Sequence, residues 1–315
     1  MDQRRTRLPG SRARLGHVGE ERDRGGRHGG LGRTGEDGAR AVPRARTGCG
    51  DEAGDGGADT GSAAPAGHAA HSAYRERASR LSGAVLWTHT ASGPARPVLP
   101  DGCTDLIWSE GLLLVAGPDT GPHLPDAAPP GTRHIGLRFA PGQGPAVFGV
   151  PARELRDLRV PLADLWPAAQ ARELAGRMAA GGAPDRVLEE TAVARLRAAA
   201  DRTAAGPAAR SAPPPRSGRT AAIAAALDRG RPVAEVARAV ALGERQLHRH
   251  CLDAFGYGPK TLTRVLRFVR ALGLARSGMP YAHVAACAGY ADQAHLAREV
   301  KALAGAPMGV LLGSG

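Results

Sequence analysis

Two short segments near the C-terminus carry polar side chains at spacings that suit contact with DNA bases. In the first, Arg245, His248 and Arg249 stand at i, i+3 and i+4, so a helix would place them on one face. In the second, Gln293 and Arg298 occupy the corresponding stretch. Arginine can bond guanine O6 and N7 with two hydrogen bonds, and glutamine can pair with adenine N6 and N7. The sequence therefore predicts two helix faces that can each enter a major groove.

The predicted DNA-binding residues extend beyond these five side chains. The full set in the two segments is Arg245, Gln246, His248, Arg249, Asp292, Gln293, Arg298 and Lys301. We expect Lys301, together with Arg264, Arg267 and Arg270 between the segments, to contact backbone phosphates. Solvated helix faces would show the same residue types, but the recurrence of the pattern on a basic segment favours DNA binding.

Each segment follows a pattern typical of a helix-turn-helix unit. A small residue, Ala237 or Ala285, falls four residues before a short turn, where two helices must cross closely. The turn ends in an apolar side chain, Leu242 or Tyr290. The next helix keeps one apolar stripe, which is Leu247, Cys251 and Phe255 in the first unit and Leu296, Val300 and Leu303 in the second. The chain is therefore expected to contain two such units.

One long helix is expected between the two units, over residues 260–275. Its apolar positions follow the spacing of one buried face, and they are Leu262, Val265, Leu266, Val269 and Leu272. Pro232, Pro259 and Pro280 each open a helical pattern in its first turn, where a missing N–H costs nothing. The last hundred residues are therefore expected to be helical throughout.

Residues 217–312 resemble the DNA-binding domain of AraC-type transcriptional regulators. The similarity rests on Leu247-x-Arg249 followed by Phe-Gly-Tyr-Gly-Pro at 255–259, and on the run of residues 289–298. It implies two helix-turn-helix units joined by a long helix. It also implies base or backbone contacts from the recognition-helix residues, which are Arg245, His248, Arg249, Gln293 and Arg298.

This sequence departs from the family pattern at three places. Ala241 occupies a turn position that is often glycine. Cys251 and Val300 stand where aromatic residues are typical, and the closing segment 305–307 is one residue shorter than usual. These departures concern local packing and individual contacts rather than the fold.

The rest of the chain divides by composition. Residues 1–71 are rich in Gly, Arg and Asp and are expected to form a disordered tail, whether solvated, scanning DNA or preceding the true translation start. A β-rich regulatory domain follows over 72–204, with strands over 84–87, 104–108, 112–116 and 135–139 and helices over about 168–180 and 184–201. A Pro-rich linker over 205–218 then leads to the helical domain, residues 219–315. The predicted fold class is α+β, with a β-rich domain before an all-α domain.

The β-rich domain resembles the uncharacterised, actinobacterial-type N-terminal domain of a subset of AraC-type regulators. The similarity spans about residues 74–166 and rests on the runs 99–108, 116–120 and 149–155. It implies that this domain senses a small molecule, mediates dimerisation, or both. A ligand pocket could be lined by Trp87, Asp101, Asp105, Trp108 and Arg138, although a structural core with charged turn residues is the simpler interpretation.

No catalytic residue, metal site or cofactor is expected. Cys103 lies between Asp101 and Asp105, whose charges oppose formation of a thiolate. The four cysteines form no C-x-x-C pair, and no close His-x-His spacing accompanies them in the β-rich domain. The glycine pairs of the tail open no helix, so a phosphate-binding loop is not expected.

Charge and hydropathy agree with a cytoplasmic DNA-binding protein. The chain has 42 basic and 30 acidic residues, and residues 216–315 alone have 14 basic and 6 acidic ones. No apolar run is long enough for a membrane span. The expected partners are double-stranded DNA, a small-molecule effector, RNA polymerase and a second copy of the chain. The alternative is an enzyme or DNA-repair protein that uses the helical domain as a DNA tether.

Overall fold

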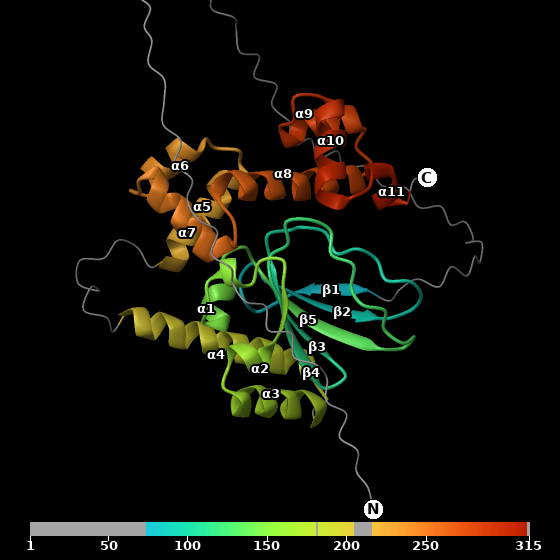
Figure 1. Cartoon of the computed structure of the whole chain (residues 1–315), viewed down its shortest axis with the longest axis vertical. Coiled ribbons are helices and arrows are strands. Elements are labelled where there is room, and N and C mark those ends of the chain that lie inside the picture. The colour runs from blue at the N-terminus through green and yellow to red at the C-terminus, as the bar shows by residue number, and fades with distance from the viewer. Residues whose placement is uncertain (1–73, 181, 205–215, 314–315) are drawn as a thin grey trace, which may run out of the picture. The chain divides into compact units, whose positions relative to one another are not determined.

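The computed structural model describes residues 74–180, 182–204 and 216–313, all of which fall within one compact unit. A β-rich part precedes an all-helical part, so the α+β fold class expected from the sequence is confirmed (Figure 1). The predicted disordered tail, residues 1–71, lies outside the described residues, as does most of the predicted linker. Within the described ranges, no helix is both long and apolar enough to cross a bilayer.

The β-rich part is built on one six-stranded antiparallel sheet. Its strands are β1 (Arg75–Ala78), β2 (Val85–Thr90), β3 (Thr104–Ser109), β4 (Leu112–Ala116), β5 (Arg133–Phe139) and β6 (Arg159–Pro161), in the order β1-β2-β5-β3-β4-β6. A two-residue turn joins β3 to β4, and its Glu110 and Gly111 both have positive φ, as a tight hairpin requires.

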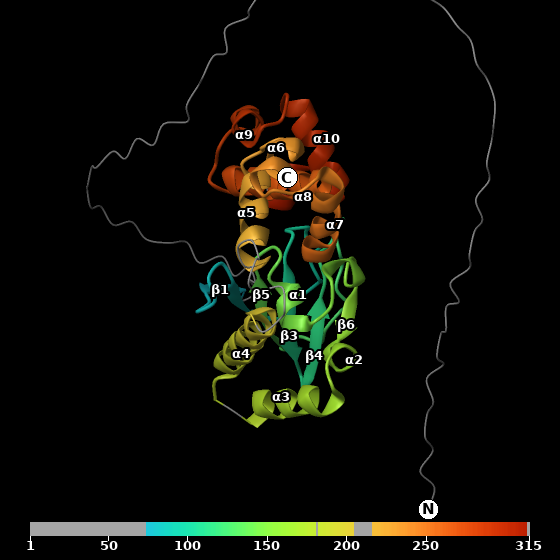
Figure 2. The same cartoon turned by 90° about the vertical axis from the view of Figure 1, so that its left-hand side faces the viewer.

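One face of the sheet forms the core of this part. Strand alternation places Leu86, Leu106 and Leu137 on that face, where all three are buried. Four helices contribute to the same core, and they are α1 (Gly144–Phe148), α2 (Leu162–Leu165), α3 (Ala168–Ala180) and α4 (Pro184–Ala204). Helices α1 and α4 lie in front of the sheet in Figure 2. The alternate positions, including Trp87, Asp105 and Arg138, are therefore left on the opposite face.

The strands and helices expected from apolar periodicity are present as β2 to β5, α3 and α4. The two edge strands, β1 and β6, were not expected. β1 is exposed along its whole length and β6 has three residues, so neither contains a buried alternation that a sequence pattern could show.

The helical part contains two helix-turn-helix units at the two ends of one long helix (Figure 1). The helices are α5 (Arg216–Asp228), α6 (Val233–Ala239), α7 (Glu244–Phe255), α8 (Pro259–Arg276), α9 (Tyr281–Ala288), α10 (Gln293–Ala304) and α11 (Met308–Leu312). Helices α6 and α7 form the first unit, α9 and α10 form the second, and α8 joins them. A short 3-10 helix, η1 (Ala152–Glu154), belongs to the preceding β-rich part.

Both turns close in the same way. The N–H of Leu242 donates to the carbonyl of Ala237 at 2.9 Å, and the N–H of Tyr290 donates to that of Ala285 at 2.8 Å. Both alanines are buried, at 2% and 1% exposed, as expected where the helices cross. The residue before each apolar side chain is left-handed, with φ of 53° at Ala241 and 80° at Gly289.

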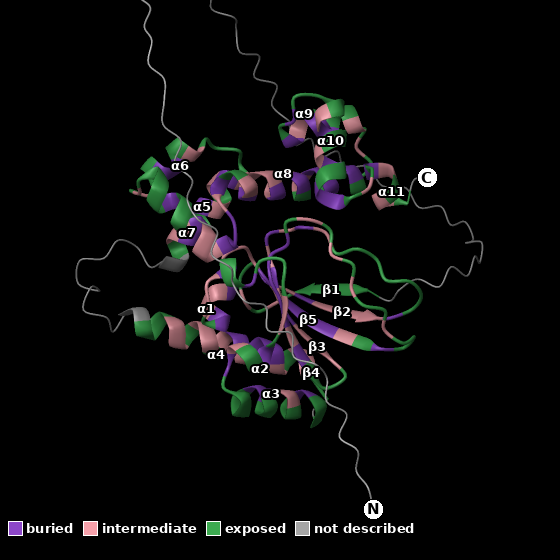
Figure 3. Cartoon of the chain, in the orientation of Figure 1, coloured by how far each residue is buried: buried purple, intermediate pink, exposed green. Residues whose placement is uncertain are grey.

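The apolar stripes predicted for the second helix of each unit are confirmed, because all six side chains are buried. The stripe predicted for the long helix was wrong at one position. Val269 is 38% exposed, whereas Phe268 is fully buried. Figure 3 shows that buried and intermediate residues alternate along α8. Because α8 packs against α5, α9 and α10, its buried surface is wider than one stripe and includes Phe268, three residues after Val265.

The predicted linker over 205–218 was too long at its C-terminal end, since α5 already begins at Arg216. The physical reason lies in the sequence, because the proline run ends at Pro215 and the next residues can donate helical hydrogen bonds. The domain boundaries themselves stay predictions.

The comparison of the two turns predicts a stabilising substitution. Ala241→Gly should raise the free energy of unfolding by about 1 kcal/mol, because glycine adopts positive φ without the steric cost that alanine incurs. Gly289→Ala should lower it by a similar amount, since no atom lies within 4 Å of the added Cβ and the cost is purely conformational. Urea denaturation of both variants tests this, and equal stabilities would contradict it.

Candidate nucleic-acid interface and a polar network on the sheet

Helix α7 presents the side chains expected to contact DNA. Arg245, His248 and Arg249 are exposed, while the apolar stripe of the helix is buried on the other side. Gln246 is also exposed, but its Oε1 accepts a hydrogen bond from the N–H of Gly243 at 2.9 Å. Gln246 therefore helps to begin the helix and has only its amide NH2 group left for another partner.

Helix α10 presents a second polar face. Gln293, Arg298 and Lys301 are exposed on it. Asp292 is the N-cap residue, and its Oδ1 accepts from the N–H of His295 at 2.6 Å. Asp292 therefore helps to begin α10, and its contact with DNA stays a prediction.

The three arginines of α8, for which phosphate contacts were predicted, pair with other elements of the helical part. Arg264 Nε lies 2.6 Å from Glu299 on α10, and Arg270 Nη2 lies 2.8 Å from Asp228 on α5. Arg267 donates to the carbonyl of Gly289 at 3.3 Å and lies 4.5 Å above the Tyr290 ring. All three connect α8 to neighbouring elements of the helical part while their side chains stay partly exposed.

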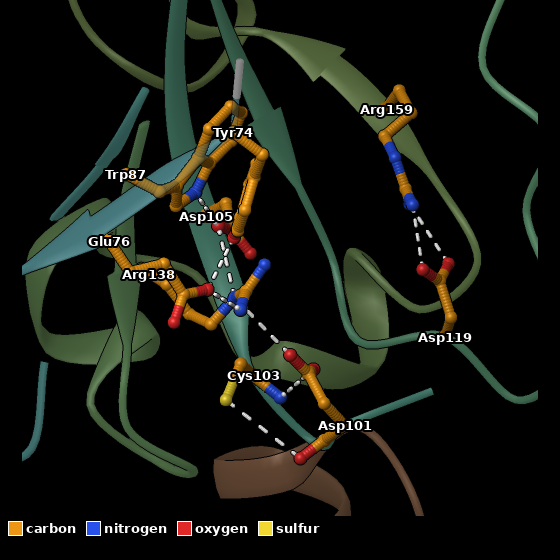
Figure 4. A network of polar contacts seen from close by, with 9 residues as sticks. All are labelled: Tyr74, Glu76, Trp87, Asp101, Cys103, Asp105, Asp119, Arg138 and Arg159. Carbon is orange, nitrogen blue, oxygen red and sulfur yellow. Dashed lines mark hydrogen bonds and ion pairs between the residues drawn. The ribbon is translucent and has the colours of Figure 1, made fainter. Parts of the chain in front are cut away.

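The sheet brings four of the five candidate ligand residues together (Figure 4). Asp105 and Arg138 are direct partners in the β3–β5 ladder. Trp87 Nε1 donates to Asp105 Oδ1 at 2.6 Å, and Arg138 Nε lies 3.4 Å from Asp105 and 3.3 Å from Asp101. These side chains form one connected polar network on the face opposite the core.

The network includes Glu76 and Tyr74, which sequence reasoning missed. Arg138 Nη1 lies 3.3 Å from Glu76 Oε1, and the Tyr74 hydroxyl donates to the same carboxylate. Glu76 pairs with Trp87 in the ladder of the edge strand β1. No apolar alternation marks that strand, so the sequence offered no signal for these residues.

Trp108 does not belong to this network, which corrects the sequence-based expectation. It lies on β3 three residues after Asp105, so strand alternation directs it to the opposite face, where it packs against the core. Its buried indole nitrogen has no hydrogen-bond partner among the described residues.

An aromatic layer covers part of the network. A Cβ at Gly136 would lie 2.1 Å from Trp87 Cε2, so the ring lies directly over the glycine backbone of β5. On its other side Trp87 stacks with Tyr74, with 6.1 Å between ring centroids. Glycine is required at 136 because the indole occupies the space that a side chain would need.

Burial governs the titration of this cluster. It raises the pKa of the Asp105 carboxyl to about 6, although the neighbouring Arg138 acts in the opposite direction. Burial opposes the charge of Arg138, but Asp105 and Asp101 raise the pKa of the guanidinium. Burial and the same two carboxylates raise the pKa of Cys103 well above its usual range, so this thiol is not activated as a nucleophile. Among the described residues, no group of His, Cys, Asp and Glu is arranged to hold a metal ion.

Two family models match the chain, each over less than half of its length. Residues 221–312 match a model described as a helix-turn-helix domain. Residues 84–161 match one described as a domain of unknown function (DUF6597). A comparison with curated proteins found no match. The C-terminal part is thus a helix-turn-helix domain, and its resemblance to the AraC-type domain is confirmed by this match and by the double unit around α8.

Solved structures of ToxT from Vibrio cholerae are similar to the chain at low TM-scores. One has a TM-score of 0.40 and 7% identity and covers 76% of this chain and 97% of its own. Another, of ToxT with a bound unsaturated fatty acid, has a TM-score of 0.37 and 10% identity and covers 75% of this chain and 96% of its own. The likeness is distant, and no ligand follows from it for this chain.

The raised pKa of Asp105 predicts a pH-dependent stability. The folded protein holds this proton more tightly than the unfolded chain, so the contribution of Asp105 to the free energy of unfolding should fall as pH rises from about 4 to about 6. Asp105→Asn should reduce that slope, whereas Asp126→Asn, at an exposed position, should not. Urea denaturation across this range measures both, and an unchanged slope for Asp105→Asn would refute the assignment.

Proposed function

We propose that this protein is a sequence-specific DNA-binding transcriptional regulator that inserts α7 and α10 into successive major grooves. The observation that carries the proposal is the repeated unit, in which matching turns present an exposed polar helix face with an arginine at its centre, Arg249 or Arg298. The basic excess of residues 216–315 supports attraction to a phosphate backbone.

The length of α8 suits this arrangement. Its 18 residues span about 27 Å at the rise of an α-helix, and the two units lie at its ends. Successive major grooves on one face of DNA are about 34 Å apart. The ion pairs of Arg264 and Arg270 would keep α8 and its neighbours rigid, so that the spacing of the recognition helices is held constant.

Within this proposal the exposed side chains contact different parts of the DNA. Arg245, His248 and Arg249 would contact bases from α7, and Gln293 and Arg298 would do so from α10. Gln246 would contact DNA through its free amide group, and Lys301 would contact phosphate.

The β-rich part is proposed to regulate DNA binding by a small molecule, by dimerisation, or by both. The network of Arg138, Asp101 and Asp105 is the candidate effector site, because it concentrates partly buried charges on a face that the core does not use. Sedimentation of the full chain with and without candidate effectors distinguishes a dimerisation module from a sensor. RNA polymerase is a proposed partner, and the cytoplasm is the proposed location.

The enzyme alternative receives no support from Cys103, because the pKa of its thiol is raised rather than lowered. An enzyme that uses this cysteine would lose turnover on Cys103→Ala. Under the regulator proposal, the same substitution leaves sequence discrimination unchanged.

Arg249→Ala and Arg298→Ala test the proposed base contacts. Each should reduce discrimination between a selected DNA site and its point mutants by about 1–3 kcal/mol at the contacted position, since a bidentate contact is lost. Sites are first selected from random DNA with the full-length protein, and affinities are then measured by titration.

Two further variants separate base contacts from general electrostatics. Lys301→Ala should weaken binding to all sequences and reduce the salt slope by about 1, as expected for one phosphate contact. Arg133→Ala removes an exposed charge from β5 and should alter neither quantity. If Arg249→Ala and Arg298→Ala retain full discrimination, the recognition-helix assignment is wrong.

A further inference from the structure

The β-rich part packs closely against the backbone of the first helix-turn-helix unit. Gly256 ends α7 with φ of 84°, and a Cβ there would lie 2.6 Å from Pro118 Cγ and 3.3 Å from the carbonyl oxygen of Ala152. The turn after α7 therefore lies against the segment that contains η1.

A second close approach involves a glycine of the β-rich part. Gly142 has φ of 87°, and a Cβ on it would lie 2.3 Å from Thr220 Cγ2 and 2.9 Å from Phe255 Cε1. Phe255 is the last residue of α7 and is buried, so this contact reaches the core of the helical part. A side chain larger than hydrogen at 142 would have to displace the side chains of Thr220 and Phe255.

A third contact connects the polar network to the same region. Gly102 has φ of 79°, and a Cβ there would lie 3.3 Å from Tyr257 Oη and 3.7 Å from Leu262 on α8. Tyr257 is buried, and burial followed by the charge of Asp101 raises the pKa of its hydroxyl. Leu99, three residues earlier, packs against the core of the helical part.

Polar groups add to these contacts. Arg156 Nη1 donates to the carbonyl of Gly256 at 3.4 Å, and Arg153 forms an ion pair with Asp253 on α7. Asp253 follows Arg249 by four residues, so this pair lies on the same side of α7 as the arginine proposed to contact DNA. The contacts therefore end where the proposed DNA-reading face begins.

We propose that Gly102, Pro118, Gly142 and η1 form a docking face whose partner is the first helix-turn-helix unit of the same chain. Docking on this face restrains the C-terminal half of α7 and the turn before α8. In the second unit, a Cβ on Gly305 would lie 3.4 Å from Pro122 Cγ, but among the described elements it is α7 that contacts η1 and α1, so the restraint acts mainly on the first unit. This inference goes beyond the proposed DNA binding and does not require it.

The polar network can alter the docking face through Asp101. The Asp101 carboxylate lies 3.3 Å from Arg138 Nε and accepts from the N–H of Cys103 at 2.8 Å, so it holds the turn that contains Gly102. A ligand or proton that changes the Arg138 ion pairs would therefore change the position of Gly102 against Tyr257.

Gly142→Ala tests the docking face, with Gly111→Ala as the matched control. Both glycines have φ of 87°, but no atom lies within 4 Å of a Cβ at 111, so only Gly142→Ala meets the helical part. Hydrogen exchange of the full chain should become about ten-fold faster for amides of residues 250–258 in Gly142→Ala than in Gly111→Ala, as expected when a local restraint is lost. Equal exchange rates in the two variants would overturn the proposal.

Two more variants keep the test decisive. Thr220→Ser in the Gly142→Ala background removes the clashing methyl group and keeps the hydroxyl that lies 3.0 Å from His250 Nε2, so it should restore slow exchange in part. If Gly142→Ala does not fold, Pro118→Ala, which removes contacts without adding bulk, should speed exchange at the same amides. Unchanged exchange in Pro118→Ala would then overturn the proposal.

Discussion

The helical part depends on the burial of α8. Leu262, Val265, Phe268 and Leu272 are buried among α5, α9 and α10, and no other element of the described ranges contacts both helix-turn-helix units so extensively. The partly exposed arginines of α8 pair with neighbouring elements, namely Arg264 with Glu299, Arg270 with Asp228 and Arg267 with the carbonyl of Gly289. The burial of α8 and these pairs hold the two helix-turn-helix units together, and the predicted phosphate contacts of the three arginines stay predictions.

The two helix-turn-helix units form the same turn with different residues. Each turn needs a left-handed residue between a buried helix and the apolar side chain that closes the turn. The second unit uses Gly289, which adopts that conformation freely, and the first uses Ala241, which does not. The first unit thus has the less favourable turn, and it is also the unit that the β-rich part contacts most. Its conformation is consequently shaped by tertiary contacts more than that of the second unit.

Strand alternation places apolar side chains on one face of the sheet and polar side chains on the other. Leucines at alternate positions of β2, β3 and β5 form the core with the helices, and the intervening positions gather Trp87, Asp105 and Arg138. Three carboxylates surround one guanidinium, and burial raises the pKa of one of them. Such a network is sensitive to a change in charge because its partly buried members are screened less than surface charges.

Local patterns in the sequence determined the elements that bury a regular apolar stripe, including the stripes of α7 and α10 and strands β2 to β5, since periodicity reports directly which face is covered. They also indicated which polar residues of α7 and α10 are exposed. Tertiary structure decided the rest. The edge strand β1, the partners of Arg264, Arg267 and Arg270, and the face of Trp108 depend on which segments become neighbours. The requirement for glycine at 142 also depends on tertiary structure. It arises from Thr220 and Phe255, residues distant in sequence that only the fold brings close.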